Sequence, residues 1–287
     1  MKIAVVHLRH KMLTRKYNPE KTLNILTEAR RRGASLAVVS PLLSIEDILE
    51  NYPRSRIKSV LKSYSTRLPG SAVKPVIESA IFNGLIVITP GLLERAGPKL
   101  FSSSIMIRPT GVVSSKDRYR RITITKMEAE VGISAGKEIT VFNIGEIRIG
   151  ILMDEDILIP EIARYLSENR VDILIYCVKK RSLSEPSKIR RLASSRALEN
   201  NVPIIVAGGM VERHGELLYI VPSLLVNERG EVVGEAFEDE DIILIPLTLK
   251  RNTTSTTTRQ FSPESYKIFS KICKDLSKMY KGRTELQ

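Results

Sequence analysis

The sequence is poor in the residues on which several classes of protein depend. Its 287 residues include no tryptophan, two cysteines and three histidines, and aromatic side chains make up only 5%. Two cysteines cannot build a disulfide-rich scaffold, and without a CxxC pair or histidines at ligand spacing we predict no metal site. The scarcity of aromatic side chains also argues against a stacking surface for single-stranded nucleic acid.

Long apolar runs and nucleotide-binding motifs are missing as well. No apolar run approaches the roughly 20 residues of a membrane-spanning helix, so we expect no membrane association. Residues 2–7 are apolar but too few for a secretory signal, and they predict a strand. Without a GxGxxG or P-loop pattern we predict no cofactor. The few cysteines favour a reducing, cytoplasmic location.

Basic residues outnumber acidic ones by 45 to 32, which gives a formal net charge of +13. The densest basic patch consists of Lys179, Lys180, Arg181, Lys188, Arg190 and Arg191. A charge-rich solvated surface of the kind common in thermophile proteins explains this composition, and so does a partner such as nucleic acid or an acidic protein. The even spread of charge and the lack of any nucleic-acid-binding motif favour the solvated surface.

Short apolar runs alternate with helix-like segments along the chain. The predicted strands are residues 2–7, 36–39, 85–89, 148–153, 172–177, 203–207 and 242–247. The predicted helices are residues 18–33, 71–82, 160–168 and 188–200, with hairpins at 104–113 and 219–234. This alternation indicates an α/β fold with a mixed sheet, or two sheets packed face to face.

The composition changes near residue 250. We predict one domain over residues 1–250, a polar Thr/Ser-rich linker over 251–262, and a C-terminal helix and tail over 263–287. The helix is expected to extend to about residue 280 and to dock on the body or on a partner. Its predicted apolar stripe is Tyr266, Phe269, Ile272, Cys273 and Leu276.

Four stretches, in this order, resemble segments of the nitrilase (carbon–nitrogen hydrolase) superfamily. Residues 31–42 resemble a helix, a strand and the "FPE" motif, and residues 111–121 resemble the "G…yRK" segment. Residues 148–164 resemble "iGvliCyD…fPE.aR", and residues 196–200 resemble "RAxEN". The order of these motifs and their coverage of nearly the whole chain make the resemblance specific for the fold.

The resemblance implies a four-layer α-β-β-α sandwich that assembles as a homodimer or a larger homo-oligomer. It also implies a site at strand ends where a cysteine attacks the C–N substrate, a glutamate transfers the proton and a lysine stabilises the oxyanion.

The sequence departs from this pattern at all three catalytic positions. Leu42 stands at the glutamate position, Arg121 at the lysine position and Asp154 at the cysteine position. Leucine carries no proton, arginine does not readily release one, and aspartate is a poor nucleophile toward an amide. Glu46 lies too far along the chain to replace the missing glutamate. We therefore expect a catalytically degenerate protein with a ligand-binding, regulatory or assembly role.

Two other functions stay open. The first is an amidase-type C–N hydrolase with a rewired site, in which Asp154 activates water and Arg121 stabilises the oxyanion. It predicts an open pocket with room for water between these two side chains. The second is a basic scaffold that binds nucleic acid or an acidic partner. In the degenerate protein, Arg121 and Asp154 form a buried pair that fills the old pocket, or they bind a small polar ligand.

Several further residues are candidates for the pocket. Glu128 or Glu130 matches the family's second glutamate on a predicted loop, although a solvated glutamate fits equally well. Cys177 is either a displaced nucleophile or, as we favour, a buried inert thiol, and Lys179 lies at the expected pocket mouth. Cys273 is expected in the core or at an interface. The three histidines are expected to pack or cap: His7, His10 and His214.

Overall fold

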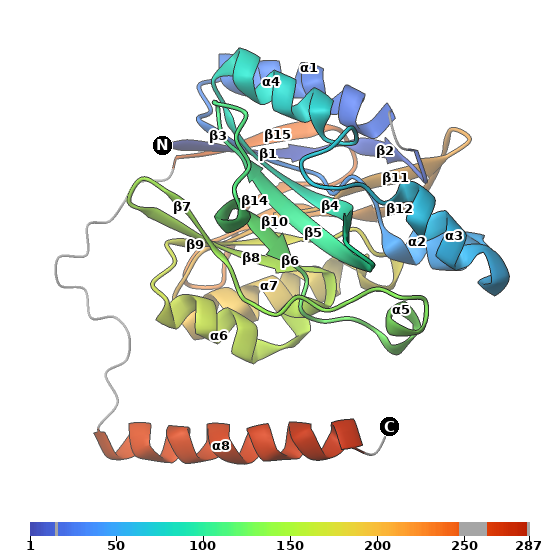
Figure 1. Cartoon of the computed structure of the whole chain (residues 1–287). Helices are drawn as coiled ribbons and strands as arrows, with labels where there is room; N and C mark the ends of the chain where they lie inside the picture. Colours follow the sequence, from blue (N-terminus) through green and yellow to red (C-terminus); the bar gives the residue numbers. More distant parts are fainter. Residues whose placement is uncertain (15–16, 247–262, 286–287) are drawn as a thin grey trace. The chain divides into compact units, whose positions relative to one another are not determined.

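The computed structural model describes residues 1–14, 17–246 and 263–285 (Figure 1). The chain forms two units, Met1–Leu249 and Lys250–Gln287, and each is described here by itself. The predicted linker, residues 251–262, lies outside the described residues. Over the described ranges, no helix combines the length and the apolar character that crossing a membrane requires.

Two six-stranded sheets and one three-stranded sheet form the first unit. The first sheet contains, in spatial order, β15 (Asp241–Pro246), β1 (Lys2–His7), β3 (Leu36–Val39), β4 (Ile86–Ala96), β5 (Lys99–Ile107) and β6 (Arg118–Arg120). The second contains β14 (Val232–Ala236), β13 (Ser223–Val226), β10 (Ile204–Ala207), β9 (Ile173–Cys177), β8 (Ile147–Met153) and β7 (Val141–Ile144). The third contains β12 (Glu216–Val221), β11 (Gly209–Arg213) and β2 (Arg9–Lys11).

Helices cover the outer faces of the two large sheets, as Figure 1 shows. Helices α1 (Tyr17–Arg31) and α4 (Lys74–Asn83) pack on the first sheet, and α6 (Pro160–Glu168) and α7 (Pro186–Asn200) pack on the second. A central core of mostly β-branched side chains fills the space between the sheets, with residues such as Val5, Val38, Ile151 and Ile175 fully buried. The fold is therefore the four-layer α-β-β-α sandwich that the resemblance implies.

Parallel pairing brings the ends of β8 and β9 together, and a hydrogen bond of 3.1 Å from the Lys179 Nζ to the Leu42 carbonyl brings the segment after β3 to the same region. Strand β3 pairs in parallel with β1, and β8 and β9 pair in parallel with each other. The carboxyl ends of parallel strands are where α/β proteins place their ligand sites. Leu42 follows β3, Asp154 follows β8, and Lys179 follows β9.

Three predicted features of the fold are wrong. The hairpin at residues 104–113 does not form: β5 ends at Ile107 and pairs with β4 and β6 instead. The predicted strand 219–226 is divided at Pro222 between β12 and β13, which lie in different sheets. The loop predicted around Glu128 contains a short helix, α5 (Lys126–Glu130), because Thr125 caps it through a reciprocal capping box with Glu128.

Two helices and one sheet were not predicted at all. Helices α2 (Ile45–Asn51) and α3 (Arg54–Tyr64) follow β3 directly, and the three-stranded sheet joins segments far apart in the sequence. Strand β2 has only three residues, all polar or basic, so no local pattern identifies it.

The second unit contains helix α8 (Pro263–Glu285), which is longer than predicted. Ile272 and Cys273 of the predicted stripe are exposed on α8 taken by itself, and the expectation that Cys273 lies in the core or at an interface stays a prediction. The side chains of Tyr266 and Phe269 are outside the described part of the chain.

Candidate functional site

Arg121 is the centre of a buried network of charged side chains. It directly follows β6, its side chain is fully buried, and its guanidinium contacts three carboxylates. Nη1 donates to Asp154 Oδ2 at 2.9 Å and to Glu155 Oε2 at 3.0 Å, and Nη2 donates to Glu128 Oε1 at 2.5 Å. Burial lowers the pKa of Arg121, but the carboxylates around it outweigh burial and raise the pKa overall.

Asp154 occupies a strained position at the end of β8. Its φ is +47°, a left-handed conformation uncommon outside glycine, although aspartate and asparagine adopt it more readily than most residues. Oδ2 accepts from Arg121, and Oδ1 accepts from the backbone N–H of Lys179 at 3.3 Å. Burial raises the pKa of Asp154 against the opposing effect of Arg121 and Lys180.

Asp156 fixes the strand end that carries Asp154. Its fully buried carboxylate accepts from the Tyr119 hydroxyl at 2.7 Å, the Thr123 hydroxyl at 2.7 Å, and the backbone N–H groups of Thr123 and Met153 at 3.0 Å each. These bonds connect the end of β8 to the segment that contains Arg121. Asp156 therefore positions Asp154 and Arg121 relative to each other.

Of the two glutamates considered for the second carboxylate, the structure brings only Glu128 into the network. Glu128 is buried on α5, and its Oε1 contacts both Arg121 and the Lys180 Nζ, the latter at 3.2 Å. Burial raises the pKa of Glu128, but Arg121 and then Lys180 outweigh it and lower the pKa overall. Glu130 lies at the surface.

Lys180 and Glu155 complete the network, and neither was expected there from the sequence. The Lys180 Nζ donates to Glu155 Oε1 at 2.5 Å, and its side chain is 3% exposed. Burial raises the pKa of Glu155, and the neighbouring Asp154 raises it further. We call Arg121, Glu128, Asp154, Glu155 and Lys180 the charged network.

The basic patch predicted from the sequence does not exist as one surface. Lys179 and Lys180 are buried, because each points into the protein toward acceptors there. Arg190 pairs with Glu235, and Arg191 lies 3.8 Å from Glu185. Arg181 is exposed and Lys188 half-exposed. The six residues of the predicted patch are thus divided among buried, paired and solvent-exposed positions.

Lys179 belongs to a second group of buried polar side chains, which surrounds the segment that contains Leu42. Its Nζ donates to the Leu42 carbonyl at 3.1 Å, and burial lowers its pKa to about 8 despite the nearby Asp47. Asp47, on α2, accepts from the Tyr219 hydroxyl at 3.1 Å, and burial raises its pKa to about 6. His10 contacts the Pro41 carbonyl at 3.2 Å. These side chains hold the segment that follows β3.

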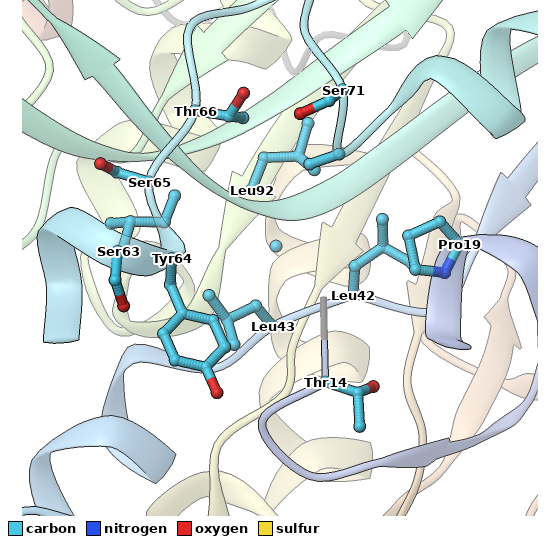
Figure 2. A pocket seen from close by; sticks show the side chains of 13 residues that line it. Thr14, Pro19, Leu42, Leu43, Ser63, Tyr64, Ser65, Thr66, Ser71 and Leu92 are labelled. Carbon is cyan, nitrogen blue, oxygen red and sulfur yellow. The ribbon is translucent and has the colours of Figure 1, made fainter. Parts of the chain in front are cut away.

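Leu42 supplies an apolar wall where the family has its glutamate. Its side chain is 5% exposed and lines a cavity of about 290 Å³ (Figure 2). Leu43 and Leu92 also line this cavity, and the described residues around it include no charged side chain. Gly91 allows the Leu42 backbone to lie close to β4, because a Cβ at position 91 would lie 2.8 Å from the Leu42 nitrogen. No member of the charged network lines the cavity.

The remaining candidates lie outside the charged network. Cys177 is buried in the core between the sheets, and burial raises its pKa well above the usual thiol range, so it remains a protonated thiol. His7 contacts Ser223 and the Phe237 carbonyl, and His214 is exposed. Over the described residues, no group of three or more His, Cys, Asp or Glu side chains is arranged to hold a metal ion.

The charged network differs from the open site that a rewired hydrolase was expected to have. Arg121 and Asp154 are in direct contact, so no water fits between them. Solvent still reaches one edge of the network, because the side chains of Asp154 and Glu155 are 15% and 19% exposed.

Comparisons with known proteins agree with the fold. The model of the carbon-nitrogen hydrolase family matches residues 2–256. A nitrilase of Pyrococcus abyssi is 26% identical over 255 residues, which cover 88% of this chain and 92% of the relative. The omega-amidase NIT2 of Bos taurus is 22% identical over 241 residues, 82% of this chain and 84% of the relative.

Solved structures of one amidase have the same fold. A double mutant of the amidase from Nesterenkonia sp. AN1, in complex with acrylamide, superposes with a TM-score of 0.70 at 15% identity and covers 94% of this chain and 97% of its own. Another form of that amidase, with acrylamide added at its active-site cysteine, has a TM-score of 0.68 at 18% identity, with coverage of 86% and 93%.

These relatives overturn the expectation of a catalytically degenerate protein. The sequence relatives are named as a nitrilase and an omega-amidase, which points to C–N hydrolysis rather than to a role without catalysis. The match over residues 2–256 and the sandwich fold lead to one conclusion about descent: the chain belongs to the carbon–nitrogen hydrolase family.

Proposed function

We propose that the chain is an amidase-type C–N hydrolase that works without a thiol and uses Asp154 as the base that activates water. Family membership and the names of the relatives support C–N hydrolysis. The substitutions at Leu42, Arg121 and Asp154 require that the reaction differ from the thiol mechanism of the family. The observation that carries the proposal is the geometry of Asp154.

Asp154 has three properties of a general base. It stands where the family has its nucleophile, its carboxylate is partly exposed, and its pKa is raised, which strengthens it as a base near neutral pH. Its left-handed backbone is an outlier of the kind that clusters at active sites. Two fixed donors, the Arg121 guanidinium and the Lys179 N–H, keep the carboxylate in one orientation.

The proposed reaction has two steps. Asp154 takes a proton from a water molecule at the exposed edge of the network while the water oxygen bonds to the amide carbon. The resulting tetrahedral oxyanion collapses, the C–N bond breaks, and Asp154 returns the proton to the departing nitrogen. The products are a carboxylic acid and ammonia, or an amine, and Asp154 is regenerated as the carboxylate.

Arg121 is the proposed stabiliser of the oxyanion. Its Nε is buried and has no hydrogen-bond acceptor within the described part of the chain, which leaves this N–H available to a developing negative charge. Three carboxylates hold its guanidinium in place, so no reorganisation is needed as the charge appears. Arginine acts here as a fixed charge and does not donate its proton.

Ammonia release from simple primary amides tests the proposal. Asp154→Asn keeps the size of the side chain but removes the base, so we expect kcat/KM to fall by about 10²–10⁴-fold. Glu130→Gln is the matched control, because Glu130 is an exposed carboxylate on the helix that carries Glu128. Equal activity in Asp154→Asn and the natural protein, or no ammonia from any amide, would overturn the proposal.

We also propose that the protein acts in the cytoplasm as a homodimer or a larger homo-oligomer. The family resemblance supports the assembly, and the small number of cysteines supports a reducing compartment. Light scattering on the purified full chain tests the assembly, and the mass of a single chain would contradict it.

A further inference from the structure

The exposed edge of the charged network is entirely acidic. Only two of its five side chains are appreciably reached by solvent: Asp154, at 15%, and Glu155, at 19%. The remaining members are at most 3% exposed: Arg121, Glu128 and Lys180. A molecule that approaches the network from solvent therefore meets two carboxylates before it meets either cation.

The two terminal nitrogens of Arg121 and the Lys180 ammonium are already engaged with carboxylates, and only the buried Arg121 Nε lacks an acceptor among the described residues. Arg121 contacts all three acidic members, and Lys180 contacts Glu128 and Glu155. Three carboxylates against two cations give the network a formal charge of −1. A substrate carboxylate at this exposed edge meets Asp154 and Glu155 and no exposed cation of the network, and such a contact between like charges is unfavourable.

The two residues that follow Lys180 are also in contact with acidic side chains. Arg181, the residue after Lys180, lies 4.0 Å from Glu50, and the backbone N–H and hydroxyl of Ser182 donate to Glu46. Both glutamates belong to α2. Burial raises the pKa values of Asp154 and Glu155 even though Arg121 and Lys180 lower both.

We propose that the substrates are amides that carry a positive charge, such as an ammonium group a few bonds from the C–N bond that is cleaved, and that substrates with a carboxylate there are rejected. The cationic group pairs with Glu155 at the exposed edge while Asp154 activates water. This inference rests on the proposed function for turnover, but the preference for a cation is also a property of binding.

Three amides of similar chain length separate the effect of charge from that of size. They are 4-aminobutanamide, which is cationic, pentanamide, which is neutral, and succinamate, which is anionic. We expect kcat/KM for 4-aminobutanamide to exceed that for pentanamide by about tenfold, with succinamate the poorest substrate. Raising NaCl to 1 M screens the exposed carboxylates and reduces these ratios.

Glu155→Gln tests which residue produces the preference. We expect this variant to lose most of the discrimination between 4-aminobutanamide and pentanamide, whereas Glu130→Gln keeps it. Binding of the three amides is measured in parallel by calorimetry, so that affinity is observed without turnover.

The outcomes distinguish this inference from the proposed function. Selective binding of 4-aminobutanamide without ammonia release upholds the cation preference and overturns hydrolysis. Hydrolysis of all three amides at similar rates, or a preference for succinamate, overturns the cation preference and leaves hydrolysis standing. The absence of both binding and turnover overturns both.

Discussion

Replacement of Arg121 by methionine tests the charged network most severely. The side chain is fully buried, so Arg121→Met leaves three carboxylates with only Lys180 to compensate them. Removing one partner of a buried ion pair costs about 3–5 kcal/mol, because the charge that remains is uncompensated. A domain of this size loses roughly 2–4 °C in Tm for each kcal/mol, so we expect Tm to fall by about 10 °C.

The pH dependence of this loss is a second test. Without Arg121, the pKa values of the buried carboxylates rise above their unfolded values, so the native state binds more protons than the unfolded state. Stability then falls as pH rises, and the destabilisation is larger at pH 8 than at pH 5.

Urea unfolding of the full chain at both pH values measures the effect, with two matched variants. Arg181→Met removes an exposed arginine 4.0 Å from Glu50 and is expected to cost less than about 0.5 kcal/mol. In the double variant Arg121→Met/Glu128→Gln, one of the uncompensated carboxylates is also removed, so we expect part of the lost stability to be recovered. A cost below about 1 kcal/mol for Arg121→Met, or a loss independent of pH, would refute the reasoning.

The remaining predictions concern Asp47, which helps to hold the segment after β3, and Asp156, which positions Asp154 and Arg121. Burial raises the pKa of Asp47 to about 6 from 3.8, so its protonated form favours folding and this contribution is lost as pH rises between these values. In Asp47→Asn we expect that part of the pH dependence of the unfolding midpoint to vanish, and an unchanged slope would contradict the assignment. Asp156→Asn removes a carboxylate that accepts four hydrogen bonds, and we expect it to lower the free energy of unfolding by about 2–4 kcal/mol. We also expect it to reduce activity, because Asp156 positions Asp154. The exposed Asp239→Asn serves as its control in the same unfolding and ammonia assays, and equal stability of the two variants would be inconsistent with a positioning role for Asp156.

The layers of the fold were predictable because their strands are short, continuous apolar runs. Strands such as β3 and β9 are buried throughout and are rich in Val, Ile and Leu, a pattern that local sequence displays directly. The three-stranded sheet was not predictable in this way, because β2 is three residues long and its partner β11 lies about 200 residues away. Its formation depends on tertiary contacts rather than on any local preference.

The candidate site was predictable in its positions but not in its contacts. The family resemblance identified Arg121, Asp154 and the alternative of Glu128 or Glu130, whereas burial on α5 decided between the two glutamates. The sequence does contain a signal for the roles of Glu155 and Lys180. An acidic run after β8 and a lysine pair after the adjacent parallel strand β9 place opposite charges at neighbouring strand ends.

Activity of a thiol-free variant tests the central claim most directly. Cys177→Ser combined with Cys273→Ser removes both cysteines of the chain, and ammonia release from 4-aminobutanamide is compared with that of the natural protein and of Asp154→Asn. If Asp154 activates water, the thiol-free variant retains its rate and Asp154→Asn loses it. Loss of activity in the thiol-free variant while it stays folded, or activity that persists in Asp154→Asn, would contradict hydrolysis by an aspartate-activated water.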